Sequence, residues 1–403
     1  MHTAVRTRLS IMMFLQYAIW GGWCVVGSVY FQELHFTDTQ TGWLYSALWL
    51  ACIVAPFIGG QIADRYFPTQ LFLGVVHLIG GVFLLLMARE RSFAPMMTYM
   101  GVYTVLYAPT LALTNSICFQ NLEDVGRDFG RIRVFGTLGW IAVGWVLTVW
   151  RTTVSEPVLG DLFYLAGGAS ILLGVFCFFL PHTPPKKEAE RPFAFLEALS
   201  LLKDKNFAIF LSIAFVVTTE LQFYYIPTAI FLEEIGVSKA NVPSVMTIAQ
   251  IAEIITMALL LPYFIKHIGV RWTLAIGVIA WPLRYIVFAI GGPVPLVIAS
   301  LAFHGLGYTF FFVASQIYVD NVASSTSRAS AQSLLTLVTL GVGNYLGTMF
   351  YVYIKNMFTT MQNGQPVTNW STLFLVPCAL TAVCALAFLL LFKPSQAQLK
   401  TAG

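Results

Sequence analysis

Three polar side chains share one face of an apolar run between residues 132 and 150. Arg133, Thr137 and Trp140 are separated by four and then three residues, so they align along one side of a helix. A guanidinium, a hydroxyl and a flat aromatic ring in one row suit a polar ligand that contains a ring, through hydrogen bonding and stacking. The alternative is that Arg133 lies near the end of the run and reaches toward water or closes a gate.

A second polar pair, Gln250 and Glu253, lies in the apolar run 243–265. Because these residues are three positions apart, the amide and the carboxylate point the same way on a helix. The amide can both donate and accept hydrogen bonds, and a carboxylate removed from water can take up a proton. We expect Glu253 to contact a substrate or carry a proton; the alternative is a structural ion pair with Arg133 or Arg284.

The apolar run 207–231 carries three more candidates. Gln222 and Tyr225 share one face of the expected helix, where they can line a cavity. Glu220 points roughly the opposite way, which leaves both a structural ion pair and a direct part in transport open. Pro227 frees a backbone carbonyl and allows the helix to bend.

His304 and Tyr308 are one helical turn apart in the run 295–319. Because histidine titrates near neutral pH, His304 can line a cavity and carry a proton, or it can simply bond one helix to another. We interpret Arg284 and Asp320 as charges that pack helices or close a gate.

The overall composition makes each of these polar residues unusual. Of 403 residues, 58% are hydrophobic and only 10% are charged, whereas soluble domains carry about 25% charged residues. The mean hydropathy is +0.77, so most of the surface must face lipid. An ionisable group at the centre of a bilayer costs about 2.5 to 3.5 kcal/mol, and each one therefore needs a partner or a water-filled cavity.

Several classes of protein are excluded by the same sequence. The net charge is only +4, with no extended basic face, which argues against a nucleic-acid partner. The six cysteines lie inside apolar runs and form no CxxC pair, so neither a zinc site nor a disulfide framework is expected. There is no Walker A motif and no recognisable catalytic constellation. We expect no cofactor, no metal and no enzymatic activity.

Twelve apolar runs are long enough to cross a bilayer as helices, which predicts an all-α membrane protein. They span residues 9–30, 41–63, 69–88, 95–118, 132–150, 161–181, 207–231, 243–265, 272–291, 295–319, 329–354 and 371–392. The boundaries are good to a few residues, because sequence patterns locate helices better than their ends.

The polar stretch 182–205 divides the chain into two halves of six helices, 1–181 and 206–403. If the N-terminus is cytoplasmic, the loops on that side hold fifteen lysines and arginines and the opposite loops hold five. This bias places both termini and the linker 182–205 in the cytoplasm.

The segment from Gly60 through Asp64 to Arg65 resembles the G-x-x-x-D-R signature of the major facilitator superfamily. In that superfamily the aspartate and arginine brace the cytoplasmic ends of neighbouring helices in one of the alternating states. The resemblance implies two six-helix bundles and a gating role for Asp64 and Arg65, with Arg328 as a further gating residue.

A closer resemblance, to the bacterial nucleoside:proton symporters, extends along nearly the whole chain. The segments that carry it are 14–21 (FLQYAIWG), 107–111 (YAPTL), 132–139 (IRVFGTLG), 220–222 (ELQ), 250–253 (QIAE), 280–284 (AWPLR) and 328–332 (RASAQ). The resemblance implies substrate contacts at Arg133, Thr137, Trp140, Gln222, Gln250 and Glu253, with Trp140 stacking on the base.

The chain departs from the family pattern at three positions. Tyr225 stands where the family has an asparagine, and His304 where an aromatic hydroxyl is expected. Thr309 replaces an aspartate that is a candidate for proton coupling, which leaves Glu253, Glu220 or His304 to carry the proton, or leaves transport uncoupled.

We therefore expect a nucleoside importer in the bacterial inner membrane, working as a monomer by alternating access and driven by protons. Tyr225, His304 and Tyr308 join the expected substrate-binding residues. The alternatives are a uniporter, a symporter of another small polar solute such as a sugar, and a nutrient sensor that binds without transporting.

Replacing Arg133 with alanine should weaken nucleoside binding. The change removes a charge-assisted hydrogen bond, so the dissociation constant of a bound nucleoside should rise about tenfold or more. Equilibrium binding to the purified Arg133→Ala variant measures this. An unchanged dissociation constant would assign Arg133 to the gate instead of the ligand.

Overall fold

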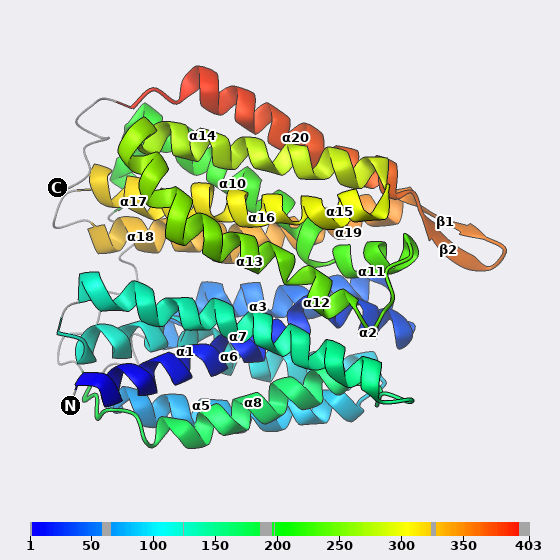
Figure 1. Ribbon diagram of the computed structural model, residues 1–403, viewed down its shortest axis with the longest axis horizontal. Coiled ribbons are helices and arrows are strands. Elements are labelled where there is room, and N and C mark those ends of the chain that lie inside the picture. Colours follow the sequence, from blue (N-terminus) through cyan, green and yellow to red (C-terminus); the bar gives the residue numbers. More distant parts are fainter. Residues whose placement is uncertain are drawn as a thin grey trace. The chain divides into compact units, whose positions relative to one another are not determined.

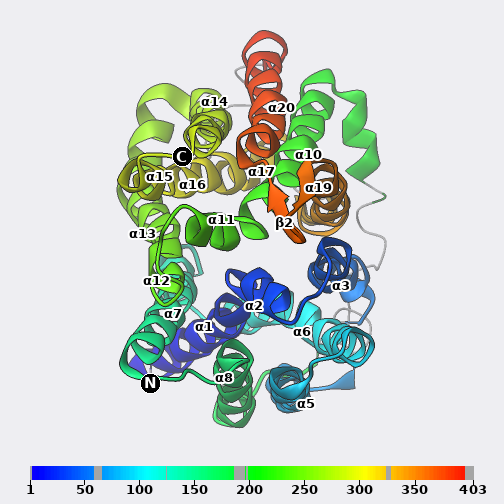
Figure 2. The same ribbon diagram turned by 90° about the vertical axis from the view of Figure 1, so that its right-hand side faces the viewer.

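A computed structural model describes residues 2–58, 66–123, 125–185, 196, 198–323 and 328–394. Contacts within the chain divide it into two compact units. The first unit comprises Met1–Pro192 and Ser238–Thr247, and the second comprises Phe193–Val237 and Ile248–Gly403. Figures 1 and 2 show both units as bundles of helices.

Helices make up the first unit in the residues described. They are α1 (His2–Cys24), α2 (Gly27–Glu33), α3 (Asp38–Ile58), α5 (Thr69–Arg89), α6 (Phe93–Asn121), α7 (Val125–Thr153), α8 (Asp161–Cys177) and α12 (Val242–Met246). Helix α1 packs on α7 and α8, and α5 packs on α6 and α8.

In its described residues, the second unit contains helices of three kinds and one hairpin. Its α-helices are α10 (Lys205–Tyr225), α11 (Thr228–Glu234), α13 (Ile248–Ile255), α14 (Leu261–Ile290), α15 (Val294–Ser300), α16 (Ala302–Gly307), α17 (Ala314–Val322), α18 (Arg328–Thr336), α19 (Asn344–Phe358) and α20 (Trp370–Leu391). A 3₁₀ turn, η2 (Leu199–Lys203), precedes α10. Three π-helical segments are η3 (Thr256–Leu260), η4 (Tyr308–Val313) and η5 (Leu337–Gly343).

Helical segments occupy all twelve of the ranges expected to cross the membrane, within the residues described. Nine helices there are long and apolar enough for a membrane span, and one of them, Val242–Ile290, covers two expected spans. The two spans separate at Gly269, whose φ of 80° and ψ of 168° are not helical. Only glycine adopts such a backbone without strain, so it marks the corner between the spans.

A short stretch after α11 belongs with the first unit, although the sequence places it in the second half of the chain. The Ser244 amide donates a hydrogen bond of 3.0 Å to Thr148 Oγ1, and Lys239 forms an ion pair with Glu33. The stretch 238–247 therefore contacts α2 and α7, because its polar groups find their partners there.

Glycines permit close contact between α1 and α7. A Cβ atom on Gly139 would lie 2.0 Å from the Phe14 carbonyl oxygen, and one on Gly21 would lie 2.8 Å from the Trp140 ring. In lipid, helices associate through close packing rather than a hydrophobic driving force, and small residues allow the backbones to approach. This contact fixes the rotation of α7, and with it the direction of Arg133.

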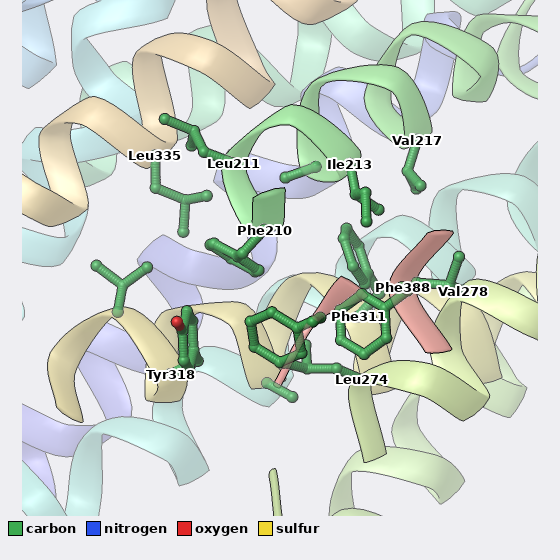
Figure 3. Packing of buried hydrophobic residues seen from close by; sticks show 14 of the residues in the cluster. Phe210, Leu211, Ile213, Val217, Leu274, Val278, Phe311, Tyr318, Leu335 and Phe388 are labelled. Atoms are coloured by element: carbon green, nitrogen blue, oxygen red, sulfur yellow. The ribbon is translucent and has the colours of Figure 1, made fainter. Parts of the chain in front are cut away.

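Aromatic packing forms the core of the second unit. The rings of Phe210 and Tyr318 have centroids 4.7 Å apart, and Phe311 lies 6.4 Å from Phe210. Figure 3 shows these rings from α10, η4 and α17 converging with Phe388 of α20. This core extends along α10 from Phe207 to Leu221, and the buried polar residues Glu220 and Gln222 lie at its C-terminal end.

A two-stranded hairpin connects α19 to α20 and projects from the helices in Figure 1. Strands β1 (Thr359–Gln362) and β2 (Gln365–Thr368) pair in antiparallel register. Asn363 and Gly364 both have positive φ, 51° and 79°. This is the Asn-Gly pattern of a two-residue type I′ turn.

The α1–α7 contact predicts a specific loss of stability. A methyl group at Gly139 has no room, so Gly139→Ala should destabilise the protein by about 1 to 3 kcal/mol through overpacking. Gly168→Ala is the matched control, because a Cβ atom there meets nothing within 4 Å. Thermal unfolding of both variants by size-exclusion chromatography measures the difference; equal melting temperatures would contradict the packing described.

Candidate functional site

In the first unit, Arg133 lies over an aromatic ring. Its guanidinium carbon is 4.0 Å from the centre of the Tyr17 ring on α1, a cation–π contact. A Cβ atom on Gly136 would lie 2.7 Å from both Arg133 Nη1 and the Tyr17 ring. Glycine at 136 therefore leaves the space that the pair occupies, and Tyr17 holds the guanidinium in place.

Trp140 packs against a second aromatic residue of α1. The rings of Trp140 and Trp20 meet edge to face with centroids 5.5 Å apart, and Trp20 meets Trp49 of α3 at 6.0 Å. The indole nitrogens of Trp20 and Trp49 have no hydrogen-bond partner among the described residues. Thr137 is partly exposed between Arg133 and Trp140. The face predicted from α7 thus continues onto α1 and α3.

Gln16 lies inside the first unit and bonds helices together. Its Nε2 donates to Thr110 Oγ1 at 2.7 Å, and the Tyr107 hydroxyl donates to its backbone oxygen at 2.7 Å. The side chain is fully buried. Gln16 therefore connects α1 to α6 in this structure.

In the second unit, the amide of Gln222 is occupied at both ends. Its Nε2 donates to Asn344 Oδ1 at 2.8 Å, and its Oε1 accepts from Thr348 Oγ1 at 3.3 Å. Gln222 is fully buried, and Gly347 brings α19 against the Thr219 carbonyl of α10. For Gln222 to bind a ligand through its amide, it must give up at least one of its hydrogen bonds to Asn344 or Thr348 on α19.

Gln250 and Glu253 lie one turn apart on α13, as expected from their spacing. Gln250 is buried and its Oε1 has no hydrogen-bond partner among the described residues, whereas Glu253 is partly exposed. The Glu253 carbonyl accepts from Thr309 Oγ1 at 3.4 Å. A Cβ atom on Gly305 would lie 2.3 Å from the Glu253 nitrogen, so α13 and α16 are in close contact here.

His304 stands at the centre of an aromatic cluster. Its ring stacks on Tyr224 at 4.3 Å, meets Tyr225 edge to face at 5.6 Å and lies 5.9 Å from Tyr308. Arg284 Nη1 is 3.1 Å from His304 Nδ1. The cluster joins three predicted binding residues, His304, Tyr225 and Tyr308, with the arginine assigned to packing.

Glu220 faces away from Gln222, as the helical spacing predicts. Its side chain is fully buried, and its backbone oxygen accepts a hydrogen bond of 3.0 Å from the Tyr285 hydroxyl. Glu220 thus contacts α14, the helix that carries Arg284, while Gln222 contacts α19.

The gating residues fall into two groups. Arg328 Nε lies 3.6 Å from Asp320 Oδ1, with both side chains about half exposed (50% and 49%). Such exposed ion pairs contribute about 0 to 1 kcal/mol, so this pair can open at little cost. Asp64 and Arg65 lie outside the described residues.

Across the described part of the chain, no three His, Cys, Asp or Glu side chains gather closely enough to hold a metal ion. The six cysteines are all free.

Sequence reasoning missed the residues that hold the candidates. Tyr17 and Trp49 shape the surroundings of Arg133 and Trp140, and Asn344 with Thr348 binds Gln222. A search for amides inside apolar runs would have found Asn344. The pairing of Tyr17 with Arg133 has no signal in either helix alone.

Comparisons with known proteins place the chain among transporters. A family described as "Nucleoside H+ symporter" matches residues 1–397. Three proteins of Escherichia coli (strain K12) are similar over nearly their full length. YegT is 36% identical over 96% of this chain and 94% of its own, and the nucleoside permease NupG is 30% identical over 98% of both. A xanthosine permease is 31% identical over 97% of this chain and 96% of its own.

Solved structures agree with this grouping. The crystal structure of the nucleoside transporter NupG has a TM-score of 0.85 and 28% identity, covering 97% of this chain and all of the other. A D-xylose-proton symporter shares the fold at a TM-score of 0.74 with 12% identity, covering 98% of each chain. The comparisons therefore agree over nearly the whole length of the chain.

The Gln222 network predicts that Asn344→Ala lowers stability. Loss of the Asn344 amide leaves the buried Gln222 Nε2 without an acceptor, which costs about 1 to 3 kcal/mol. Gln362→Ala, an amide exposed on the hairpin, is the control and should stay within about 0.5 kcal/mol of wild type. Thermal unfolding compares the two; equal stability would mean that Gln222 finds another acceptor.

Proposed function

The chain belongs to the nucleoside H+ symporter family, and on that premise we propose that it imports nucleosides with protons through the bacterial inner membrane. The observation that carries the proposal is the family match over residues 1–397. The resemblance stated from the sequence is thereby confirmed, as is the major facilitator fold expected from it. Its relatives transport solutes and are not enzymes.

In this proposal the nucleoside contacts Arg133, Thr137 and Trp140 of the first unit. The cation–π contact holds the planar guanidinium over the Tyr17 ring, and its N–H groups lie in the plane from which they can donate to the sugar or base. Trp140, held edge to face by Trp20, offers its face to the base.

The second unit supplies the remaining proposed contacts, which are Gln222, Tyr225, Gln250, Glu253, His304 and Tyr308. The unpartnered Oε1 of the buried Gln250 supports this assignment, because a buried acceptor needs a donor and nucleosides carry hydroxyl and amino donors. Glu253 lies one turn away on α13 and is partly exposed.

The topology belongs to the proposal as well. We place both termini and the linker 182–205 in the cytoplasm, take 1–181 and 206–403 as the two halves, and expect a monomer. Asp320 and Arg328, with Asp64 and Arg65, would open and close the cytoplasmic side. The weak, half-exposed pair of Asp320 and Arg328 supports this, since a gate must break its contacts in every cycle.

One observation favours uniport as a second candidate. Thr309 stands at the position of the family aspartate and donates its hydroxyl to the Glu253 carbonyl, so it cannot exchange a proton near neutral pH. Coupling then depends on another residue, and Glu253, Glu220 and His304 are the candidates.

The test is uptake of labelled uridine and adenosine into liposomes that contain the purified protein, with and without an inward proton gradient. Symport predicts that nucleoside accumulates above equilibrium only when the proton gradient is present. A gradient of one pH unit can drive about tenfold accumulation for one proton per nucleoside. Equilibration without accumulation would support uniport. No uptake of either nucleoside, with uptake of a hexose, would reject nucleosides as substrates.

A further inference from the structure

The second unit completely buries one acidic and one basic side chain. Arg284 on α14 and Glu220 on α10 are both 0% exposed. Burying an ion costs several kcal/mol even after the protein relaxes, and polar residues inside a membrane are retained mainly where they serve a function. The two residues therefore need an explanation beyond packing.

Arg284 has hydrogen-bond donors to spare. Its guanidinium carbon lies 4.4 Å from the Tyr224 ring centre and 4.5 Å from that of Tyr285, and Nη1 lies 3.1 Å from His304 Nδ1. Its Nε and Nη2 have no hydrogen-bond partner among the described residues. Aromatic faces attract the charge but do not replace these bonds, so Arg284 can still bind a second acceptor.

Glu220 is poorly supplied with donors in the same region. The Tyr285 hydroxyl interacts with its side chain but donates its proton to the Glu220 backbone oxygen at 3.0 Å. Neither carboxylate oxygen is within hydrogen-bond geometry of a partner among the described residues, although Arg284 attracts the side chain electrostatically. A buried ionised carboxylate without hydrogen bonds is costly, and a proton on one oxygen removes the charge. The arrangement therefore fits a protonated Glu220, with Arg284 bound to His304 instead.

The contact with Arg284 also fixes the state of His304. A guanidinium can only donate hydrogen bonds, so His304 Nδ1 must accept and cannot carry a proton. The ring is then neutral, with its proton on Nε2. His304 therefore does not hold the coupled proton in this arrangement.

The other ionisable groups around the cluster are Tyr224 and Tyr225 on α10, Tyr285 on α14, Tyr308 on η4, Cys384 on α20 and Glu253 on α13. Phenols and thiols ordinarily titrate above pH 8, so they do not exchange protons readily near neutral pH. Two carboxyls remain, Glu253 and Glu220. Glu253 is partly exposed among the proposed substrate contacts, whereas Glu220 is buried beside the arginine.

We propose that Glu220 binds the coupled proton and that Arg284 transmits its protonation state to His304. The inference rests on the proposed nucleoside symport. A proton from water forms an O–H bond on a Glu220 oxygen, and Arg284 then donates to His304 Nδ1. When the proton leaves, the carboxylate draws the guanidinium, whose unused donors bind it, and the bond to His304 is lost.

His304 connects this switch to the proposed nucleoside contacts. Its ring packs against both Tyr225 and Tyr308, at 5.6 Å and 5.9 Å between centroids. Release of Nδ1 frees the imidazole to rotate or change its tautomer, which alters the surface that these two tyrosines present. Proton binding and nucleoside binding are then coupled through one ring, and the coupling acts equally in both directions.

The test separates coupling from transport. Liposomes are prepared with wild type, Glu220→Gln, Glu253→Gln or Glu234→Gln. Each preparation is assayed for accumulation driven by the proton gradient and for exchange with preloaded nucleoside. A pH-sensitive dye inside the liposomes reports proton entry when nucleoside is added. Glu234→Gln is the matched control, because Glu234 ends α11, is exposed, and accepts a hydrogen bond from the Trp370 indole instead of contacting the cluster. It should accumulate nucleoside as wild type does.

Glutamine mimics the protonated, neutral glutamate, so Glu220→Gln should still exchange nucleoside across the membrane. The ratio of internal to external nucleoside should fall to about one, and nucleoside should no longer cause proton entry. Glu253→Gln should bind nucleoside more weakly but still accumulate what it transports. Gradient-driven accumulation by Glu220→Gln, or loss of proton entry in Glu253→Gln alone, would overturn the proposal.

A further variant covers the case in which Glu220→Gln does not fold. Glu220→Asp keeps a carboxyl but withdraws it by one methylene, so accumulation should persist with a displaced pH profile. A profile identical to that of wild type would also overturn the proposal. Wild type that takes up no nucleoside would reject the proposed function, and wild type that only equilibrates it would reject proton coupling and this site with it.

Discussion

Close contact between helix backbones is the constraint on which both units depend. Helices in lipid gain little from the hydrophobic effect, so they are held by contacts that only small residues allow. Gly139 lies against Phe14, Gly305 against Glu253, and Gly347 against Thr219. Each of these contacts lies within about one helical turn of a candidate residue or its partner. The packing that stabilises the bundles therefore also sets the direction of the polar side chains.

The second unit adds π-helical segments to this framework. Among the described residues, η3 follows the helix of Glu253, η4 begins at Tyr308 and η5 leads into Asn344. A π segment places one extra residue in a helical turn, and such segments occur frequently at functional sites. They interrupt the regular ladder of hydrogen bonds next to the candidate residues. In the second unit, the helices are thus least regular where binding and release would require them to adjust.

The sequence predicted helices more successfully than contacts between them. Bilayer thickness demands about 20 apolar residues per span, so composition alone located the helical ranges. Helical periodicity also placed Arg133, Thr137 and Trp140 on one face. Periodicity within one helix says nothing about its neighbour, and for that reason Tyr17 beneath Arg133 and Asn344 beside Gln222 were not foreseen. Arg284 was interpreted as a packing or gate charge, and its contacts to His304 and four aromatic rings arise only in the folded unit.

The hairpin between α19 and α20 extends from a protein that is otherwise almost entirely apolar helix. It is joined firmly at its base, where the Asn369 amide donates to the Phe358 carbonyl at 2.9 Å and the Thr359 and Thr368 hydroxyls lie 3.0 Å apart. An antibody fragment raised against its Asn363-Gly364 tip would be attached rigidly to two helices. Such a fragment would add a recognisable mass for aligning particle images of a molecule too small and featureless to orient by itself.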